Sequence, residues 1–161
     1  MVTIIVFLPL LTAVALLAFN DNKEEIIRRT ALGASVLTFL LSLGLFFGFD
    51  ETTADFQFVE RHTWIQNFGI EYYVGIDGIN LFLVLLTTFL SPLVILSTWS
   101  GVTTKVRNYL FFFLVLETGM IGAFVAIDTF LFYVFWEVML IPMYFLIGIW
   151  GGERRIYAAV K

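Results

Sequence analysis

Five long apolar stretches set the limits on what this chain can fold into. Each is close to the roughly 20 residues that an α-helix needs to cross a bilayer, and polar segments separate them. Hydrophobic residues make up 60% of the 161 residues, more than a soluble domain of this size could bury. The sequence therefore predicts one domain, an all-α polytopic membrane protein. The predicted transmembrane helices cover residues 2–19, 30–49, 79–99, 109–127 and 129–150.

The scarcity of charge, cysteine and histidine excludes several classes of function. Charged residues are 14% of the chain and the formal net charge is −4, without a basic patch, which argues against nucleic acid as a partner. Cysteine is absent, so disulfides, thiolate zinc sites and iron–sulfur ligation are excluded together. His62 is the single histidine, too few for a metal site built on imidazoles. We expect neither a metal nor a cofactor in this chain.

The positive residues fall almost entirely on one side of the predicted membrane. Eight of the nine Lys and Arg residues lie after the first, third and fifth stretches, and Arg61 alone lies on the opposite side. Because cytoplasmic loops are enriched in Lys and Arg, this distribution predicts that the N-terminus lies outside and residue 161 at the cytoplasmic side. Nothing basic precedes the first stretch, which distinguishes it from a signal peptide.

The segment 50–78 is acidic and is predicted to lie outside. Two β-prone patches, at 56–65 and 69–76, flank a short turn, a pattern that predicts a β-hairpin on the membrane surface. The alternative is an irregular loop whose Trp64, Tyr72 and Tyr73 anchor it at the interface. At the other end of the chain, the residues after 153 are read as the start of a sixth helix.

A single charge, Glu137, interrupts the apolar run FLFYVFWEVMLIPMYFLIGIW at 130–150. At 1.5 Å per residue it lies about 13 Å below the start of the helix, near the middle of the bilayer. An acidic side chain there costs about 2.5–3.5 kcal/mol on insertion scales, so an intramembrane carboxylate is by default a functional hypothesis. We interpret Glu137 as a group that handles protons or ions. The alternative is a protonated Glu that hydrogen-bonds a neighbouring helix.

The neighbours of Glu137 are consistent with a hydrated interior. Tyr133 and Tyr144, four residues before and seven after, fall on roughly the same helical face and offer hydroxyls. Pro142 has no N–H, so the carbonyl of Val138 loses its helical partner and a kink is expected. The freed carbonyl could bind water or a protonated carboxyl, although Pro142 could also be a kink for packing alone.

A second carboxylate, Glu117, lies in the preceding apolar stretch. It precedes Asp128 by 11 residues while Glu137 follows it by 9, so the two carboxylates are predicted at similar depth on antiparallel neighbours. The sequence leaves open whether they face each other. Asp128 and Asp77 are predicted to cap the N-termini of the helices that follow them. Pro92 is read as a structural kink.

Several segments together resemble a known family. FYVFWEVMLIPMYFLIGIWGG at 132–152 carries the strongest signature, and the resemblance extends to GIDGINLFLVLLTTFLSPLVILSTW at 75–99, ETGMIGAFVAIDTFLFY at 117–133 and WGGERRIYAAVK at 150–161. These segments resemble the subunit M family of the proton-pumping NADH–quinone oxidoreductase, respiratory complex I. That family is related to subunits of Mrp-type cation/proton antiporters and of membrane-bound hydrogenases.

The resemblance implies that this chain is the N-terminal part of an antiporter-like subunit in a bacterial plasma membrane. It implies that Glu137 is essential for proton translocation and pairs with a Lys on a helix beyond residue 161. Glu117 is not part of the family signature and takes no role from it. The outside hairpin would contact neighbouring membrane subunits, and NADH, FMN, Fe–S clusters and quinone would bind elsewhere in the complex.

Two other readings stay open. The first is a subunit of a cation/proton antiporter or of a hydrogenase complex. The second is a non-transporting membrane scaffold, for which Glu137→Gln would be harmless.

Overall fold

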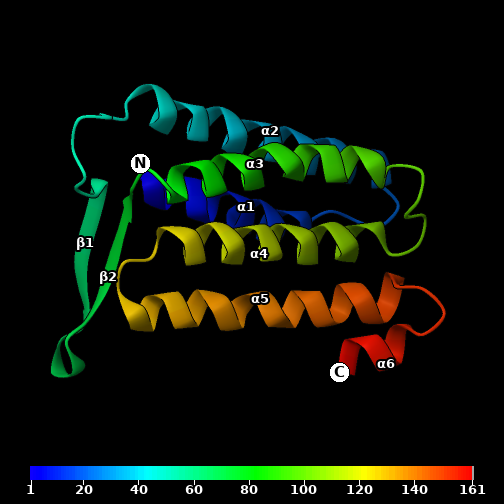
Figure 1. Ribbon diagram of the computed structural model, residues 1–161. Helices are drawn as coiled ribbons and strands as arrows, with labels where there is room; N and C mark the ends of the chain where they lie inside the picture. Colours follow the sequence, from blue (N-terminus) through cyan, green and yellow to red (C-terminus); the bar gives the residue numbers. More distant parts are fainter. Residues whose placement is uncertain (161) are drawn as a thin grey trace.

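A computed structural model describes residues 1–160 as a helical bundle with a two-stranded sheet across one end (Figure 1). Most of the chain is helical, as the apolar stretches predict. The elements in chain order are α1 (Val2–Leu16), α2 (Glu24–Phe47), β1 (Gln57–Ile65), the 3-10 turn η1 (Gln66–Phe68), β2 (Ile70–Ile76), α3 (Asn80–Ser97), α4 (Val106–Val125), α5 (Thr129–Trp150) and α6 (Arg155–Val160).

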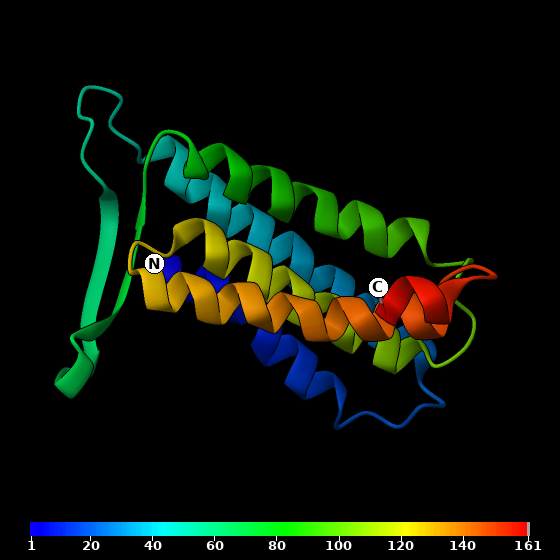
Figure 2. The ribbon, with the colours of Figure 1, turned by 60° about the horizontal axis from the view of Figure 1, so that its bottom comes forward.

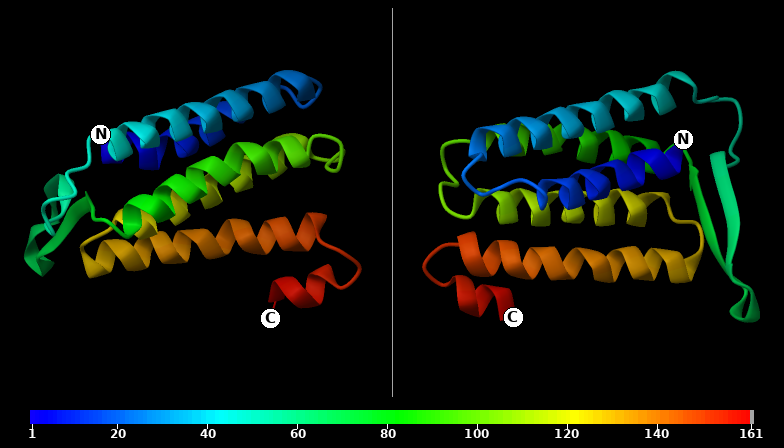
Figure 3. Two further views of the ribbon diagram at one scale, coloured as in Figure 1. Left: turned by 45° about the horizontal axis from the view of Figure 1, so that its top comes forward. Right: turned by 180° about the vertical axis from the view of Figure 1, so that it is seen from behind.

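The helices α1 to α4 pack around a common interior, and α5 lies at the edge of the bundle against α4 (Figure 3). The short α6 turns back onto the C-terminal end of α5 (Figure 1). The turn between α4 and α5 is only three residues long, so the two helices run antiparallel, as predicted. This arrangement leaves one long side of α5 without a neighbour among the described residues.

Four helices, α2 to α5, are long and apolar enough to cross a membrane. The first helix, predicted over 2–19, ends at Leu16 and is shorter, with 15 residues. The second, predicted from residue 30, begins at Glu24 because two acidic residues occupy its first turn, where the helix dipole favours negative charge. A search for apolar runs misses such charged first turns. The chain is thus a polytopic membrane protein with a mostly helical fold.

The predicted hairpin is confirmed by the antiparallel pairing of β1 with β2. Gly69 ends the connecting turn with φ of 65°, a left-handed conformation that glycine adopts without steric cost. Arg61 on β1 donates to the Glu71 carboxylate on β2 across 2.6 Å. The hairpin stands roughly perpendicular to the helices at the end where the N-terminus lies (Figure 2).

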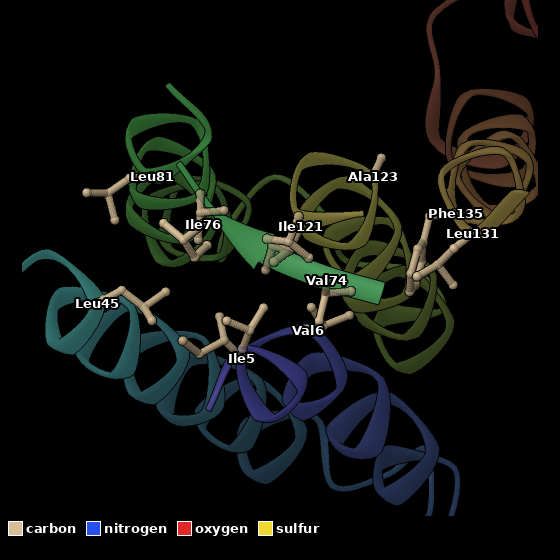
Figure 4. Packing of buried hydrophobic residues seen from close by; sticks show 13 residues of the cluster. Ile5, Val6, Leu45, Val74, Ile76, Leu81, Ile121, Ala123, Leu131 and Phe135 are labelled. Carbon is tan, nitrogen blue, oxygen red and sulfur yellow. The ribbon is translucent and has the colours of Figure 1, made fainter. Parts of the chain in front are cut away.

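Strand β2 closes that end of the bundle with apolar side chains. Val74 and Ile76 are both fully buried and point between the helices, where they meet Ile5, Leu45 and Ile121 (Figure 4). The strand also holds the turn between α4 and α5, because the N–H of residue 127 donates to the carbonyl of residue 73 across 2.9 Å. The hairpin is therefore part of the core and fixes the start of α5.

Candidate functional site

The helix α5 that carries Glu137 begins and ends where the sequence predicts. Asp128 stands at its N-cap, and its carboxylate accepts a hydrogen bond from the Leu131 N–H at 2.8 Å. Gly151 follows its last residue. Pro142 lies inside the helix and is buried, so the carbonyl of Val138 lacks its usual donor. The site is thus built on a continuous helix that has a capped start and lacks one interior hydrogen bond.

Glycines on α4 allow α5 to approach closely. A Cβ atom on Gly122 would lie 2.5 Å from two ring atoms of Phe135, and one on Gly119 would lie 2.6 Å from the Cγ of Met139. Such distances do not occur between real side chains. Phe135 and Met139 therefore mark the side of α5 that faces α4.

Glu137 lies on the other side of α5 and is exposed. Tyr133 and Tyr144 are 60% and 49% exposed and share this side, as the spacing predicts. The Tyr133 hydroxyl, one turn before, interacts with the Glu137 carboxylate. The surrounding side chains on this side are apolar and exposed: Trp136, Leu140 and Ile141. In a bilayer, this is a carboxylate with two hydroxyls on an otherwise apolar surface.

Glu117 has the opposite environment. It is fully buried, and Ser91 on α3 is the hydroxyl that interacts with its carboxyl group. The structure therefore does not bring Glu117 and Glu137 together, although both lie near mid-helix: one faces the bundle interior and the other faces outward from α5. This settles the question that the sequence leaves open.

Asp77 organises the start of α3. Its carboxylate accepts from the N–H groups of Ile79 and Asn80, at 2.9 and 2.7 Å. The Asn80 side chain in turn donates to the carbonyls of Gly75 and Phe124, each at 3.1 Å. Further along α3, Pro92 is buried inside the helix. These residues shape the scaffold and lie apart from Glu137.

Sequence reasoning passes over two groups of buried polar residues. Arg28 is 7% exposed and donates to the carbonyls of Thr98 and Val102, at 3.4 and 2.5 Å. The second group consists of buried hydroxyl residues, and the spacing of its α2 members, three and four residues apart, could have identified it. Its members are Thr12, Ser35, Thr38, Ser42, Thr88, Ser91 and Thr118.

Within residues 1–160, no three His, Cys, Asp or Glu side chains are placed to hold a metal ion together. The site on α5 consists of a carboxyl group, two hydroxyls and a carbonyl without a helical donor. Such a set of groups can take up and release a proton and can bind water.

Two family models together match the whole chain. Residues 1–126 match NADH-ubiquinone oxidoreductase chain 4, amino terminus. Residues 126–161 match the transmembrane family described as NADH:quinone oxidoreductase/Mrp antiporter.

The chain is similar to curated relatives along almost its whole length. The chain is 50% identical over 165 residues to NADH-quinone oxidoreductase subunit M of Rhodobacter capsulatus, covering 100% of this chain and 32% of the relative. It is 42% identical to subunit M of Rickettsia typhi, covering 99% and 34%. It is 46% identical to NADH-ubiquinone oxidoreductase chain 4 of Arabidopsis thaliana, covering 98% and 32%. The chain thus spans about a third of the length of these relatives.

Solved structures share the fold. Respiratory complex I from Thermus thermophilus with bound NADH contains a chain with a TM-score of 0.79 and 28% identity, covering 99% of this chain and 31% of that one. An archaeal membrane-bound sulfane sulfur reductase gives a TM-score of 0.76 at 20% identity, covering 99% and 32%, a likeness of fold alone. With the family model matched over residues 1–126, the chain belongs to the family of NADH-ubiquinone oxidoreductase chain 4, amino terminus.

Proposed function

We propose that this chain is the N-terminal part of a proton-translocating membrane subunit of an NADH–quinone oxidoreductase. The observation that carries the proposal is the position of Glu137 on the unpartnered side of α5, within a chain that resembles subunit M relatives from end to end. NADH and quinone would react elsewhere in the complex, and this subunit would convert that reaction into proton movement. No redox site is assigned to this chain.

In this proposal Glu137 takes up and releases the proton. A charge near the bilayer centre is unfavourable unless a partner or water stabilises it. The Tyr133 hydroxyl interacts with the carboxylate, Tyr144 offers a second hydroxyl on the same side, and Pro142 leaves the carbonyl of Val138 free for water. The positive partner would be a Lys on a helix after residue 161, facing the exposed side of α5.

The proposal places the chain across a bacterial plasma membrane with its N-terminus and hairpin outside. The distribution of Lys and Arg supports this orientation. The four helices α2 to α5 would cross the membrane, and so would α1, whose 15 residues would be extended by the apolar residues that follow Leu16. The hairpin covers one end of the bundle and exposes Trp64 and Phe68, which suits contact with lipid headgroups or with a neighbouring antiporter-like subunit.

The alternative is a subunit of an Mrp-type cation/proton antiporter, since the family matched by residues 126–161 includes those proteins in its description. Deletion of the complete subunit in its source organism separates the two. We expect NADH-driven quinone reduction and proton pumping by membrane vesicles to fall together, and to return with the wild-type gene. Normal NADH-driven pumping combined with loss of NADH-independent Na⁺/H⁺ exchange would overturn the proposal in favour of the antiporter.

A further inference from the structure

Eight buried polar side chains form a layer across the middle of the α1–α4 bundle. None is more than 9% exposed, and every one of the four helices contributes. We call this set the polar layer; its members are Thr12 of α1, Ser35, Thr38 and Ser42 of α2, Thr88 and Ser91 of α3, and Glu117 and Thr118 of α4.

Apolar side chains close the polar layer on both sides. Along each of the four helices the buried residues run from one apolar cluster through the polar layer into a second apolar cluster. The cluster at the hairpin end, part of which Figure 4 shows, includes Ile5, Leu45, Val84 and Ile121. The cluster at the opposite end includes Leu16, Ile27, Ile95 and Leu114. The layer therefore lies at mid-depth, where lipid offers no hydrogen bonds.

The hydroxyls of the layer direct most of their hydrogens to backbone carbonyls of their own helices. Thr38 donates to the carbonyl four residues before it at 2.9 Å, and Ser91 does the same at 3.0 Å. Ser42 and Thr88 also meet each other at 2.8 Å and join α2 to α3. Each hydroxyl that donates to a carbonyl still has oxygen lone pairs, which can accept from water or from an acid.

Glu117 is the acid in this layer. It is fully buried, and neither of its carboxyl oxygens has a hydrogen-bond partner within the part of the chain that the structure describes. The Ser91 hydroxyl interacts with it, and Ser35 also has a buried oxygen without a partner. Pro92 removes the N–H that would bind the Thr88 carbonyl, which adds another acceptor. A buried carboxyl with unmet hydrogen bonds among acceptors is suited to hold a proton and water.

The charged groups of the neighbouring helices lie away from Glu117. Within residues 1–160, α1 and α3 contain no titratable side chain. Those of α2 are confined to its first two turns, and there Arg28 binds the carbonyl of Thr98, about 10 Å along α3 from Ser91. The remaining titratable groups on the helices packed against Glu117 are Glu24, Glu25 and Arg29 of α2, Arg107 and Tyr109 of α4, and Tyr133, Glu137 and Tyr144 of α5. An ionised Glu117 would have no cation beside it in this bundle.

We propose that the polar layer is a second proton-binding site, in which Glu117 exchanges a proton with water held among the hydroxyls. The proton leaves the carboxyl group for a water molecule and returns by the same route, so the layer alternates between a neutral and an ionised carboxyl. This site is separate from Glu137, which lies on the outward side of α5. The inference rests on the burial of Glu117 and stands whether or not Glu137 translocates protons.

Infrared difference spectroscopy of the complete subunit in its assembled complex tests the proposal. Spectra recorded across a pH series report the C=O stretch of protonated carboxylic acids. We expect a band that loses intensity as the pH rises, shifts in D₂O, and is lost in Glu117→Gln. The matched control is Glu137→Gln, which removes a carboxyl group at similar depth on the outward side of α5. The band of Glu117 should remain in this variant. Ser91→Ala should shift its frequency, because that variant removes the hydroxyl that interacts with the Glu117 carboxyl group.

A Glu117 band that is present but unaffected by pH and D₂O would overturn the proposal and make this residue a permanently protonated packing group. A band displaced by Na⁺ at constant pH would overturn it in favour of a cation site. If Glu117→Gln does not assemble, Ser91→Ala decides alone. A shifted, titrating band would support the proposal, and an unchanged spectrum would refute it.

Discussion

The close approach of α4 and α5 predicts that a side chain at Gly122 destabilises the fold. A Cβ atom there would lie 2.5 Å from the Cγ and Cε1 atoms of Phe135, whose ring is 6% exposed and has little room to move. Overpacking of this kind typically costs about 1–3 kcal/mol, and such short distances place the cost of Gly122→Ala at about 2–3 kcal/mol. Alanine recovers about 1 kcal/mol through its helix propensity. We expect a net loss of about 1–2 kcal/mol in the free energy of unfolding.

Gly33→Ala is the matched control, since a Cβ on Gly33 meets nothing within 4 Å. That variant should gain up to about 1 kcal/mol from helix propensity alone. The assay is denaturant-induced unfolding of the complete purified subunit, followed by tryptophan fluorescence. The double variant Gly122→Ala/Phe135→Leu should regain part of the loss because the smaller side chain removes the ring from the contact. Equal stabilities for the two alanine variants would refute the packing argument.

Three further predictions concern the scaffold around the site. Arg28→Ala removes charged hydrogen bonds to the α3–α4 connection and should lower the free energy of unfolding by about 1.5–3 kcal/mol; an unchanged unfolding midpoint would contradict this. Burial raises the pKa of Glu60, but hydrogen bonds from the Met1 ammonium and from Thr3, with the ammonium charge, outweigh it and hold the pKa below its ordinary value. The ionised Glu60 should therefore stabilise the hairpin fully above the ordinary carboxyl pKa, and this stabilisation should be lost as the pH falls through the lower pKa of the folded state. Amide hydrogen exchange of β1 and β2 should become faster over that pH range. Glu60→Gln should abolish this pH dependence. Asp128→Ala should cost about 1 kcal/mol through loss of the α5 cap while Asp128→Asn costs less, which unfolding midpoints would separate.

The sequence predicts α5 well because local chemistry marks both of its ends. Asp128 supplies a cap and Gly151 follows the last apolar residue, so the predicted range 129–150 is the range observed. Helix α2 begins six residues before the predicted start at residue 30, because Glu24 and the charged residues after it belong to the helix but not to its apolar run. An apolar pattern therefore locates the membrane-buried part of a helix better than its ends.

Local sequence could not predict in the same way which neighbouring helix the Glu117 side chain faces. Between Leu110 and Val125 the polar side chains of α4 are only the adjacent Glu117 and Thr118, so periodicity does not show which side meets α3 and which meets α5. The glycines at 119 and 122 hold that information, since they permit close packing against α5, but their meaning depends on which side chains approach them. The polar layer is likewise a tertiary feature, built from positions on four helices far apart in sequence.

Proton translocation by closed membrane vesicles that carry Glu137→Gln in the complete subunit tests directly whether this carboxyl group moves protons. With the complex still assembled, we expect NADH-driven pumping to be lost together with coupled quinone reduction. Glu137→Asp, which keeps a carboxyl group, should retain part of both. Normal pumping by Glu137→Gln would contradict this expectation: the similarity to subunit M would then reflect shared architecture, and Glu137 would have no part in moving protons.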